Sequence, residues 1–141
     1  MNDIVLEVPG QPVPQPRARV STRGGIGRAY TPARHPIHVY RQAIELVARA
    51  SGKKMPRVPS VISIEAVFER PKSHWRKHDL SPKAPLWPNA DGDNIQKGVA
   101  DALTDAGLWE DDDQAVLWQC RKRFAARSEK PRTVITIRED V

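Results

Sequence analysis

The spacing of apolar residues alternates between a period near 3.6 and a period of two, and this alternation limits the folds open to the chain. After Pro36, apolar side chains recur three and four residues apart over about four turns, which predicts an amphipathic helix ending at Gly52. The recurring residues are Ile37, Tyr40, Ile44, Val47 and Ala48. Residues 60–70, SVISIEAVFER, then alternate apolar and polar positions, which predicts a half-buried strand.

A second helix is predicted over residues 93–106, followed by Gly107 as a stop. Its apolar stripe consists of Ile95, Val99, Ala102, Leu103 and Ala106. Gly98 lies in the interior of this helix, where glycine costs ~1 kcal/mol relative to alanine. This position indicates a close approach of another backbone.

Three further stretches are predicted to be strands. They are residues 4–10 (IVLEVPG), 115–124 (AVLWQCRKRF) and 132–139 (RTVITIRE). The order strand, helix, strand, helix, strand, strand predicts an α/β fold of the α+β kind, with two helices packed on a small mixed four-stranded sheet. The 141 residues contain no internal repeat and no domain boundary, so we expect a single domain over residues 1–141.

Residues 9–36 are rich in proline, glycine and arginine, which predicts a basic arm, loop or loose hairpin. Its arginines available for phosphate contacts are Arg17, Arg19, Arg23 and Arg28. A merely solvated loop is the alternative. The glycines at 24, 25 and 27 do not fit a dinucleotide-binding loop, because no apolar strand precedes them and no helix starts at the required place.

Residues 70–90 are predicted to form a long proline-rich loop. This loop carries Trp75 and Trp87, which are candidates for stacking on DNA or for packing in the core or in a dimer interface. The single cysteine, Cys120, is typical of a reducing compartment. No apolar run approaches the ~20 residues of a membrane span, and the N-terminus lacks the pattern of a secretory signal, so we expect a cytoplasmic protein without a membrane partner.

Charge is distributed unevenly along the chain, which carries 23 Lys and Arg against 17 Asp and Glu. The basic surplus favours polyanionic partners such as nucleic acid. Residues 91–115 nevertheless hold eight acids and one base, Lys97. A solvated helix face is one interpretation of this acidic block, and a cation site is the other.

The positions of the acids favour the cation site. Asp91 and Asp93 lie two apart directly before the second helix, and a turn at Gly92 can bring both carboxylates to one side. Capping of the helix by Asp93 or Asn94 accounts for only one of these acids. Lys97 shares a helix face with Asp93 and can steady a phosphate.

Carboxylates without histidine or cysteine among them suit Mg²⁺, with Mn²⁺ as a substitute. A calcium-binding EF-hand fails on register, because Ala102 stands where the bidentate glutamate is required. A zinc site is disfavoured for two reasons: the chain has a single cysteine, and the surroundings of its histidines are rich in proline. The four histidines are His35, His38, His74 and His78. A basic surface around a carboxylate–metal centre is the layout of a nuclease.

The segment DGDNIQKGVADALTDAGLWEDDDQ, residues 91–114, resembles the signature of RusA-type Holliday junction resolvases at nearly every fixed position. The stretches GQPVPQPRAR and RAYTP are more loosely similar to the arm of phage and prophage members. The resemblance implies that Asp91, Asp93 and Asp112 bind the metal and that Lys97 is the catalytic lysine. Counting back from Gln114 selects Asp112 among the three consecutive aspartates.

The resemblance also implies a homodimer that makes paired symmetric nicks in four-way DNA junctions, with Mg²⁺ as cofactor and 5′-phosphate products. We expect the basic arm and three residues of one strand, Arg121, Lys122 and Arg123, to contact the DNA backbone without reading sequence. The alternatives are a branched-DNA-binding protein without catalysis and a general flap or fork nuclease.

One geometric condition follows. A helix over residues 94–106 spans ~20 Å, and residues 107–112 reach at most ~20 Å when extended. Asp112 therefore rejoins Asp91 and Asp93 only if the chain doubles back, the helix is shorter, or a partner subunit contributes. We favour doubling back.

Overall fold

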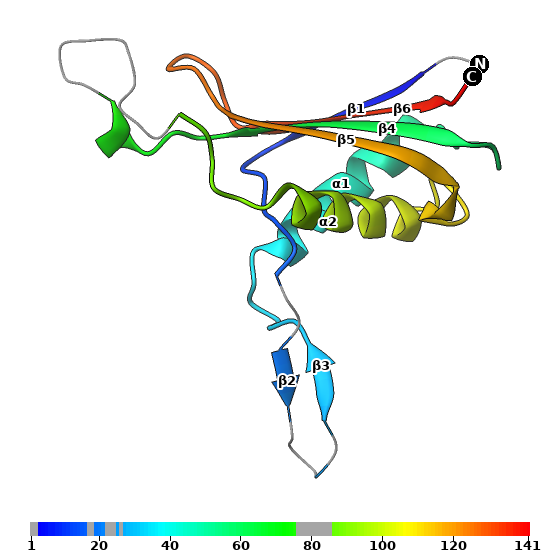
Figure 1. The fold of residues 1–141 in the computed structure, drawn as a ribbon, viewed down its shortest axis with the longest axis horizontal. Coiled ribbons are helices and arrows are strands. Elements are labelled where there is room, and N and C mark those ends of the chain that lie inside the picture. The colour runs from blue at the N-terminus through cyan, green and yellow to red at the C-terminus, as the bar shows by residue number, and fades with distance from the viewer. Residues whose placement is uncertain (1–2, 17–18, 22–24, 26, 76–85) are drawn as a thin grey trace.

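The computed structural model describes residues 3–16, 19–21, 25, 27–75 and 86–141 (Figure 1). The strands are β1 (Ile4–Pro9), β2 (Arg19–Ser21), β3 (Arg28–Tyr30), β4 (Ser60–Phe68), β5 (Ala115–Phe124) and β6 (Arg132–Glu139). The helices are α1 (Ile37–Ser51) and α2 (Gly92–Asp105), with short 3₁₀ turns η1 (Lys72–His74) and η2 (Asp112–Gln114). The predicted order is confirmed, and the hairpin β2–β3 is added within the arm.

Four strands form one mixed sheet in the order β1-β6-β4-β5. Strand β6 is antiparallel to both of its neighbours, β1 and β4. Strands β4 and β5 are parallel, because the chain crosses over through α2 between them. The crossover fixes α2 against the sheet, and the predicted α+β fold with two helices on a four-stranded mixed sheet is confirmed.

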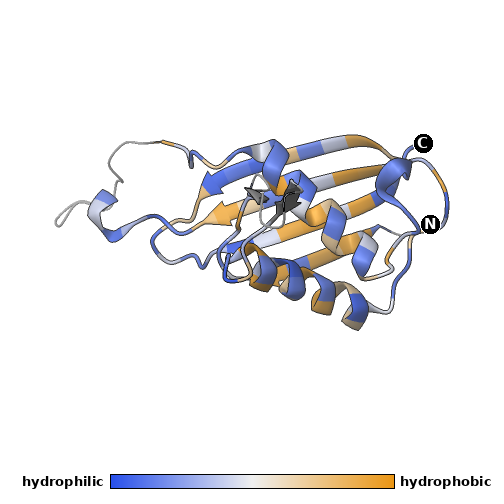
Figure 2. Cartoon of the chain, turned by 90° about the horizontal axis from the view of Figure 1, so that it is seen from below, coloured by the Kyte–Doolittle hydropathy of each residue, from blue (hydrophilic) through white to orange (hydrophobic). Residues whose placement is uncertain are grey.

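Both helices lie on the same face of the sheet, and the core fills the space between them and the strands (Figures 1 and 2). The fully buried side chains include Ile4, Leu6, Ile62, Ile135 and Ile137 from the sheet and Ile37, Ile44, Ile95 and Leu103 from the helices. The predicted helical stripes are therefore confirmed, although Val47 and Ala106 are only partly buried. Neither helix in the described part of the chain has the length and apolar character that a bilayer crossing requires.

The arm forms an antiparallel hairpin that projects away from the sheet on the helix side (Figure 1). Arg19 pairs with Tyr30 and Ser21 with Arg28 in its register. Arg17 and Arg23 lie outside the described residues, so nothing tests their predicted DNA contacts. In the proline-rich loop, the structure describes η1 and the residues from Leu86 onward.

The C-terminal ends of both helices use glycine in the left-handed conformation. Gly52 has φ 66° and its N–H bonds to the carbonyl of Arg49; Gly107 has φ 72°. Gly98 within α2 is closely packed, but its neighbours are side chains, with Ile37 Cδ1 and Gln15 Oε1 at 3.4 and 3.5 Å from an added Cβ. The backbone of the N-terminal segment does approach α2 one turn earlier, where the N–H of Gln15 donates to the carbonyl of Asn94 at 3.0 Å, while Gly98 itself is contacted by side chains.

Substitution of Gly98 by alanine should raise the free energy of unfolding by roughly 0.5–1 kcal/mol, because the added methyl group meets ordinary contacts and the helix gains propensity. Gly107→Ala is the matched control, and its positive φ should make it destabilising by about 1 kcal/mol. Urea unfolding followed by circular dichroism measures both. A loss of stability in Gly98→Ala comparable to that in Gly107→Ala would contradict this account of α2 packing.

A buried hydrogen bond joins α1 to the sheet. The hydroxyl groups of Tyr40 and Thr133 lie 2.7 Å apart, and both residues are buried. Burial raises the pKa of Tyr40 to about 12, with the hydrogen bond to Thr133 acting in the opposite direction. The folded chain therefore keeps the phenolic proton at pH values where the unfolded chain loses it.

Stability should consequently fall as the pH rises from about 10, the ordinary tyrosine value, to about 12. The loss attributable to Tyr40 should total roughly 2–3 kcal/mol over this window. Urea unfolding at successive pH values measures it as the difference between the wild type and Tyr40→Phe, which cannot ionise. Identical pH profiles for the two proteins would show that Tyr40 does not carry this dependence.

Candidate active site

The N-terminus of α2 is capped by Asp91. Its Oδ1 accepts a hydrogen bond of 2.9 Å from the backbone N–H of Asp93, and its carbonyl accepts from Ile95 at 3.1 Å. Sequence considerations named Asp93 or Asn94 as the capping residue, and this was wrong because the helix begins one residue earlier, at Gly92. Asp93 lies in the first turn, where the positive end of the helix dipole stabilises its carboxylate.

The first turn of α2 lies against β5. A Cβ on Gly92 would lie 3.9 Å from Cys120 Sγ. Burial raises the pKa of Cys120, while the charge of Lys122 lowers this pKa and the charge of Asp93 raises it. Lys122 also donates a hydrogen bond of 2.6 Å from Nζ to the carbonyl of Ala90. Strand β5 therefore contributes a lysine that holds the chain just before Asp91.

After α2 the chain reverses tightly. Gly107 takes a left-handed conformation, the N–H of Leu108 donates to the carbonyl of Leu103 at 3.1 Å, and the buried Trp109 donates from Nε1 to Thr104 Oγ1 at 2.8 Å. The turn η2 then lies beside α2, directly before β5. The return of residues 107–112 that the sequence required is thus achieved by doubling back.

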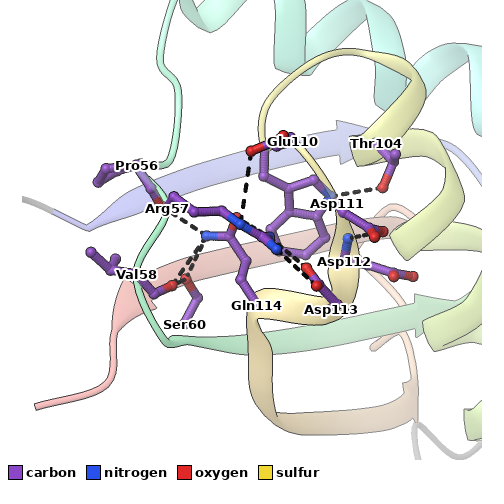
Figure 3. Close-up of polar contacts among 11 residues, drawn as sticks. Pro56, Arg57, Val58, Ser60, Thr104, Glu110, Asp111, Asp112, Asp113 and Gln114 are labelled. Atoms are coloured by element: carbon purple, nitrogen blue, oxygen red, sulfur yellow. Dashed lines mark hydrogen bonds and ion pairs between the residues drawn. The ribbon is translucent and has the colours of Figure 1, made fainter.

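Polar contacts anchor η2 to the segment before β4 (Figure 3). The amide of the buried Gln114 donates from Nε2 to Pro56 O, Val58 O and Ser60 Oγ, at 2.8, 3.2 and 3.1 Å. Arg57 forms two hydrogen bonds with the carboxylate of Asp113, and these lower the pKa of Asp113. Both anchors fix the turn directly after Asp112.

A pocket of about 230 Å³ lies between α2, η2 and β5. It is lined by Asp93, Gln96, Lys97, Ala100, Asp112 and Trp118. Partial burial raises the pKa of Asp112, and the nearby carboxylates of Asp111 and Asp101 raise it further. The negative potential of these neighbours disfavours ionisation of Asp112 and would favour a bound cation.

The pocket contains two of the three predicted metal-binding acids, Asp93 and Asp112, together with Lys97. Asp91 is not among its lining residues, because one of its oxygens caps α2. Within the described part of the chain, no group of three or more His, Cys, Asp or Glu side chains lies close enough to hold a metal ion. Mg²⁺ is commonly held by one or two carboxylates, with water and substrate phosphate completing its shell, so the donors in the pocket fit this ion.

The basic residues of β5 do not share one surface. Lys122 points to the helix face, near Asp93, whereas its neighbours Arg121 and Arg123 alternate to the opposite face. Arg123 is engaged there by Glu65 at 3.2 Å and by Glu129 at 2.6 Å. The hydrogen bond from Arg123, with further bonds from the N–H of Ala126 and from Arg132, holds the pKa of Glu129 far below its usual range. The exposed Arg121 belongs to the uncovered face of the sheet.

Sequence reasoning missed several residues that build this site. Gln114 served only to register the motif, yet its buried amide anchors η2. Trp118 appeared only as part of an alternating strand, and it forms a wall of the pocket. The charge of Asp101, which acts on Asp112, was counted only in the acidic block. The fixed spacing of Gln114 behind Asp112 was the one available signal.

Comparison with known proteins agrees with the motif. A family model described as Endodeoxyribonuclease RusA matches residues 9–138, which include the arm, α2 and η2. YqaN of Bacillus subtilis (strain 168), an uncharacterized protein, is 32% identical over 146 residues, spanning 99% of this chain and 98% of YqaN. The match covers β4, β5 and all of β6 except Glu139, but only Pro9 of β1. The chain belongs to the RusA endodeoxyribonuclease family.

Proposed function

We propose that this chain is a Mg²⁺-dependent endodeoxyribonuclease that resolves four-way DNA junctions by paired symmetric nicks. The observation that carries the proposal is the shared pocket of Asp93, Lys97 and Asp112, assembled from the first turns of α2 and from η2. Membership of the RusA endodeoxyribonuclease family supports the reaction class. Junction cleavage places the protein in DNA recombination and repair.

In this proposal Asp93 and Asp112 hold the metal, and Asp91 is the third acid of the site. Mg²⁺, or Mn²⁺ in its place, supplies Lewis acidity for hydrolysis of a phosphodiester bond. Asp91 also fixes the first turn through its bond to the Asp93 N–H. Lys97, one turn after Asp93, supplies a positive charge to the scissile phosphate.

DNA would approach a chain whose overall charge is +6 despite the acidic pocket. The hairpin arm, with Arg19 on β2 and Arg28 on β3, projects on the side of the sheet that carries α2 (Figure 1). Contacts of such arginines to phosphates would give binding without base recognition. A homodimer with two-fold symmetry would present two active sites to opposed strands of a junction, which accounts for paired nicks.

Incubation of the purified protein with a synthetic four-way junction tests the proposal. Paired nicks at symmetric positions are expected with Mg²⁺ and none with EDTA, and Mn²⁺ should restore cleavage. Flap and fork substrates in the same assay distinguish a resolvase from a general structure-selective nuclease. Tight junction binding without cleavage at any Mg²⁺ or Mn²⁺ concentration would favour a non-catalytic binding protein and reject the proposal.

Substitution of single aspartates tests the assignment within the acidic run. Asp112→Asn should lower the cleavage rate roughly 100-fold or more, because this carboxylate lines the pocket with Asp93. Asp113→Asn is the matched control. It weakens one exposed ion pair with Arg57 but leaves the buried Gln114 anchor of the turn intact, so it should change the rate by less than about threefold. Junction binding, measured without metal, should be retained by both variants. Equal losses of cleavage in the two would contradict the assignment of Asp112.

A further inference from the structure

We infer that a groove beside the candidate active site binds an unpaired nucleobase of the DNA substrate. The groove has a volume of about 750 Å³ and lies between the N-terminal segment, the end of β4 and residues 87–90. Its walls include Pro12, Pro14, Phe68, His74, Trp87 and Phe124. The identification of the occupant as DNA rests on the proposed function.

The walls of the groove suit a flat aromatic ligand. Trp87 is 63% exposed although it is large and apolar, and it is held next to the buried Pro88. His74 and Phe124 meet edge to face, with ring centroids 6.1 Å apart. Pro12 and Pro14, which also line the groove, have restricted backbones. Aromatic side chains in such a setting stack on nucleobases irrespective of sequence.

Polar groups in the groove can meet the edge of a base. Asn89 is exposed and offers an amide donor and acceptor. Gln11 is held in place because its Oε1 accepts a hydrogen bond of 2.8 Å from the N–H of Glu69. Nδ1 of His74 is buried and has no hydrogen-bond partner among the described residues, which exclude residues 76–85.

Positive charge adjoins the groove at Phe124. This ring also lines a second hollow of about 320 Å³, whose other residues include Arg70, Arg123 and Arg127. The guanidinium of Arg70 lies 4.1 Å from the centroid of Phe124, and that of Arg127 lies 4.5 Å from the centroid of Trp75. An aromatic groove beside an arginine-lined hollow matches a nucleotide, which combines a flat base with an anionic phosphate. A proline-rich peptide would use the same aromatic walls, but the position of the groove next to the first turn of α2 favours a DNA ligand.

The groove adjoins the segment that leads into the first turn of α2. Asn89 and Ala90 line it and directly precede Asp91. The carbonyl of Ala90 is held by Lys122 Nζ at 2.6 Å, so this wall of the groove and the first turn of α2 are fixed together. A base seated in the groove would therefore determine which phosphodiester of its strand reaches the pocket of Asp93 and Asp112.

The inference is tested by comparing the affinity of the protein for two single strands of equal length. One is a short thymidine oligonucleotide, and in the other the bases are replaced by abasic sites. Fluorescence anisotropy in EDTA prevents cleavage and keeps the phosphate charge equal. Wild type should bind the base-bearing strand at least about fivefold more tightly, because stacking contributes ~1–3 kcal/mol per base. Trp87→Ala should abolish this preference, and Trp87→Phe should retain most of it. The control is Leu86→Ala, because Leu86 is a similarly exposed neighbour outside the groove, and this variant should keep the preference unchanged.

Equal binding of the two strands by the wild type, or a preference that survives in Trp87→Ala, would overturn the inference. Binding of a proline-rich peptide in the groove together with equal binding of the two strands would also overturn it. The junction cleavage assay with Mg²⁺ is scored separately. A base preference without cleavage would reject the proposed function and leave the groove assignment standing. Cleavage without a base preference would support the proposed function and reject the groove assignment.

Discussion

The packing of α2 across β5 is the contact on which the arrangement of the candidate site depends. Because β4 and β5 are parallel, the chain must cross from one end of the sheet to the other between them, and α2 makes this crossing. The crossing places the first turn of α2 beside Cys120 and Lys122 on β5. It also obliges the chain to reverse after Gly107, which returns Asp112 to the same side of the helix.

The acidic residues between positions 91 and 115 have different roles in the structure. Asp105 pairs with Arg41 at 2.7 Å and ties α2 to α1, and Asp113 pairs with Arg57. Asp91 caps the helix. Asp93 and Asp112 line the pocket. Most of the block therefore holds the fold in place around two carboxylates, which are the ones proposed to bind Mg²⁺.

The periodic parts of the fold could be predicted from the sequence because each depends on residues close together in the chain. The alternation in β6 and the stripes of both helices are local patterns of this kind, and the motif of residues 91–114 located the pocket. The capping residue was misassigned because helix boundaries depend on backbone angles that the sequence does not specify. The anchoring role of Gln114 could not be predicted, since its partners Pro56 and Ser60 lie more than fifty residues earlier in the chain.

A titration of Mn²⁺ followed by electron paramagnetic resonance tests most directly whether Asp93 and Asp112 share one cation. The account predicts that Asp93→Asn and Asp112→Asn each weaken Mn²⁺ binding at least about tenfold, and that the double variant loses little more than either single one, because both act on the same site. Unchanged affinity in either single variant, or losses that add as for independent sites, would contradict it.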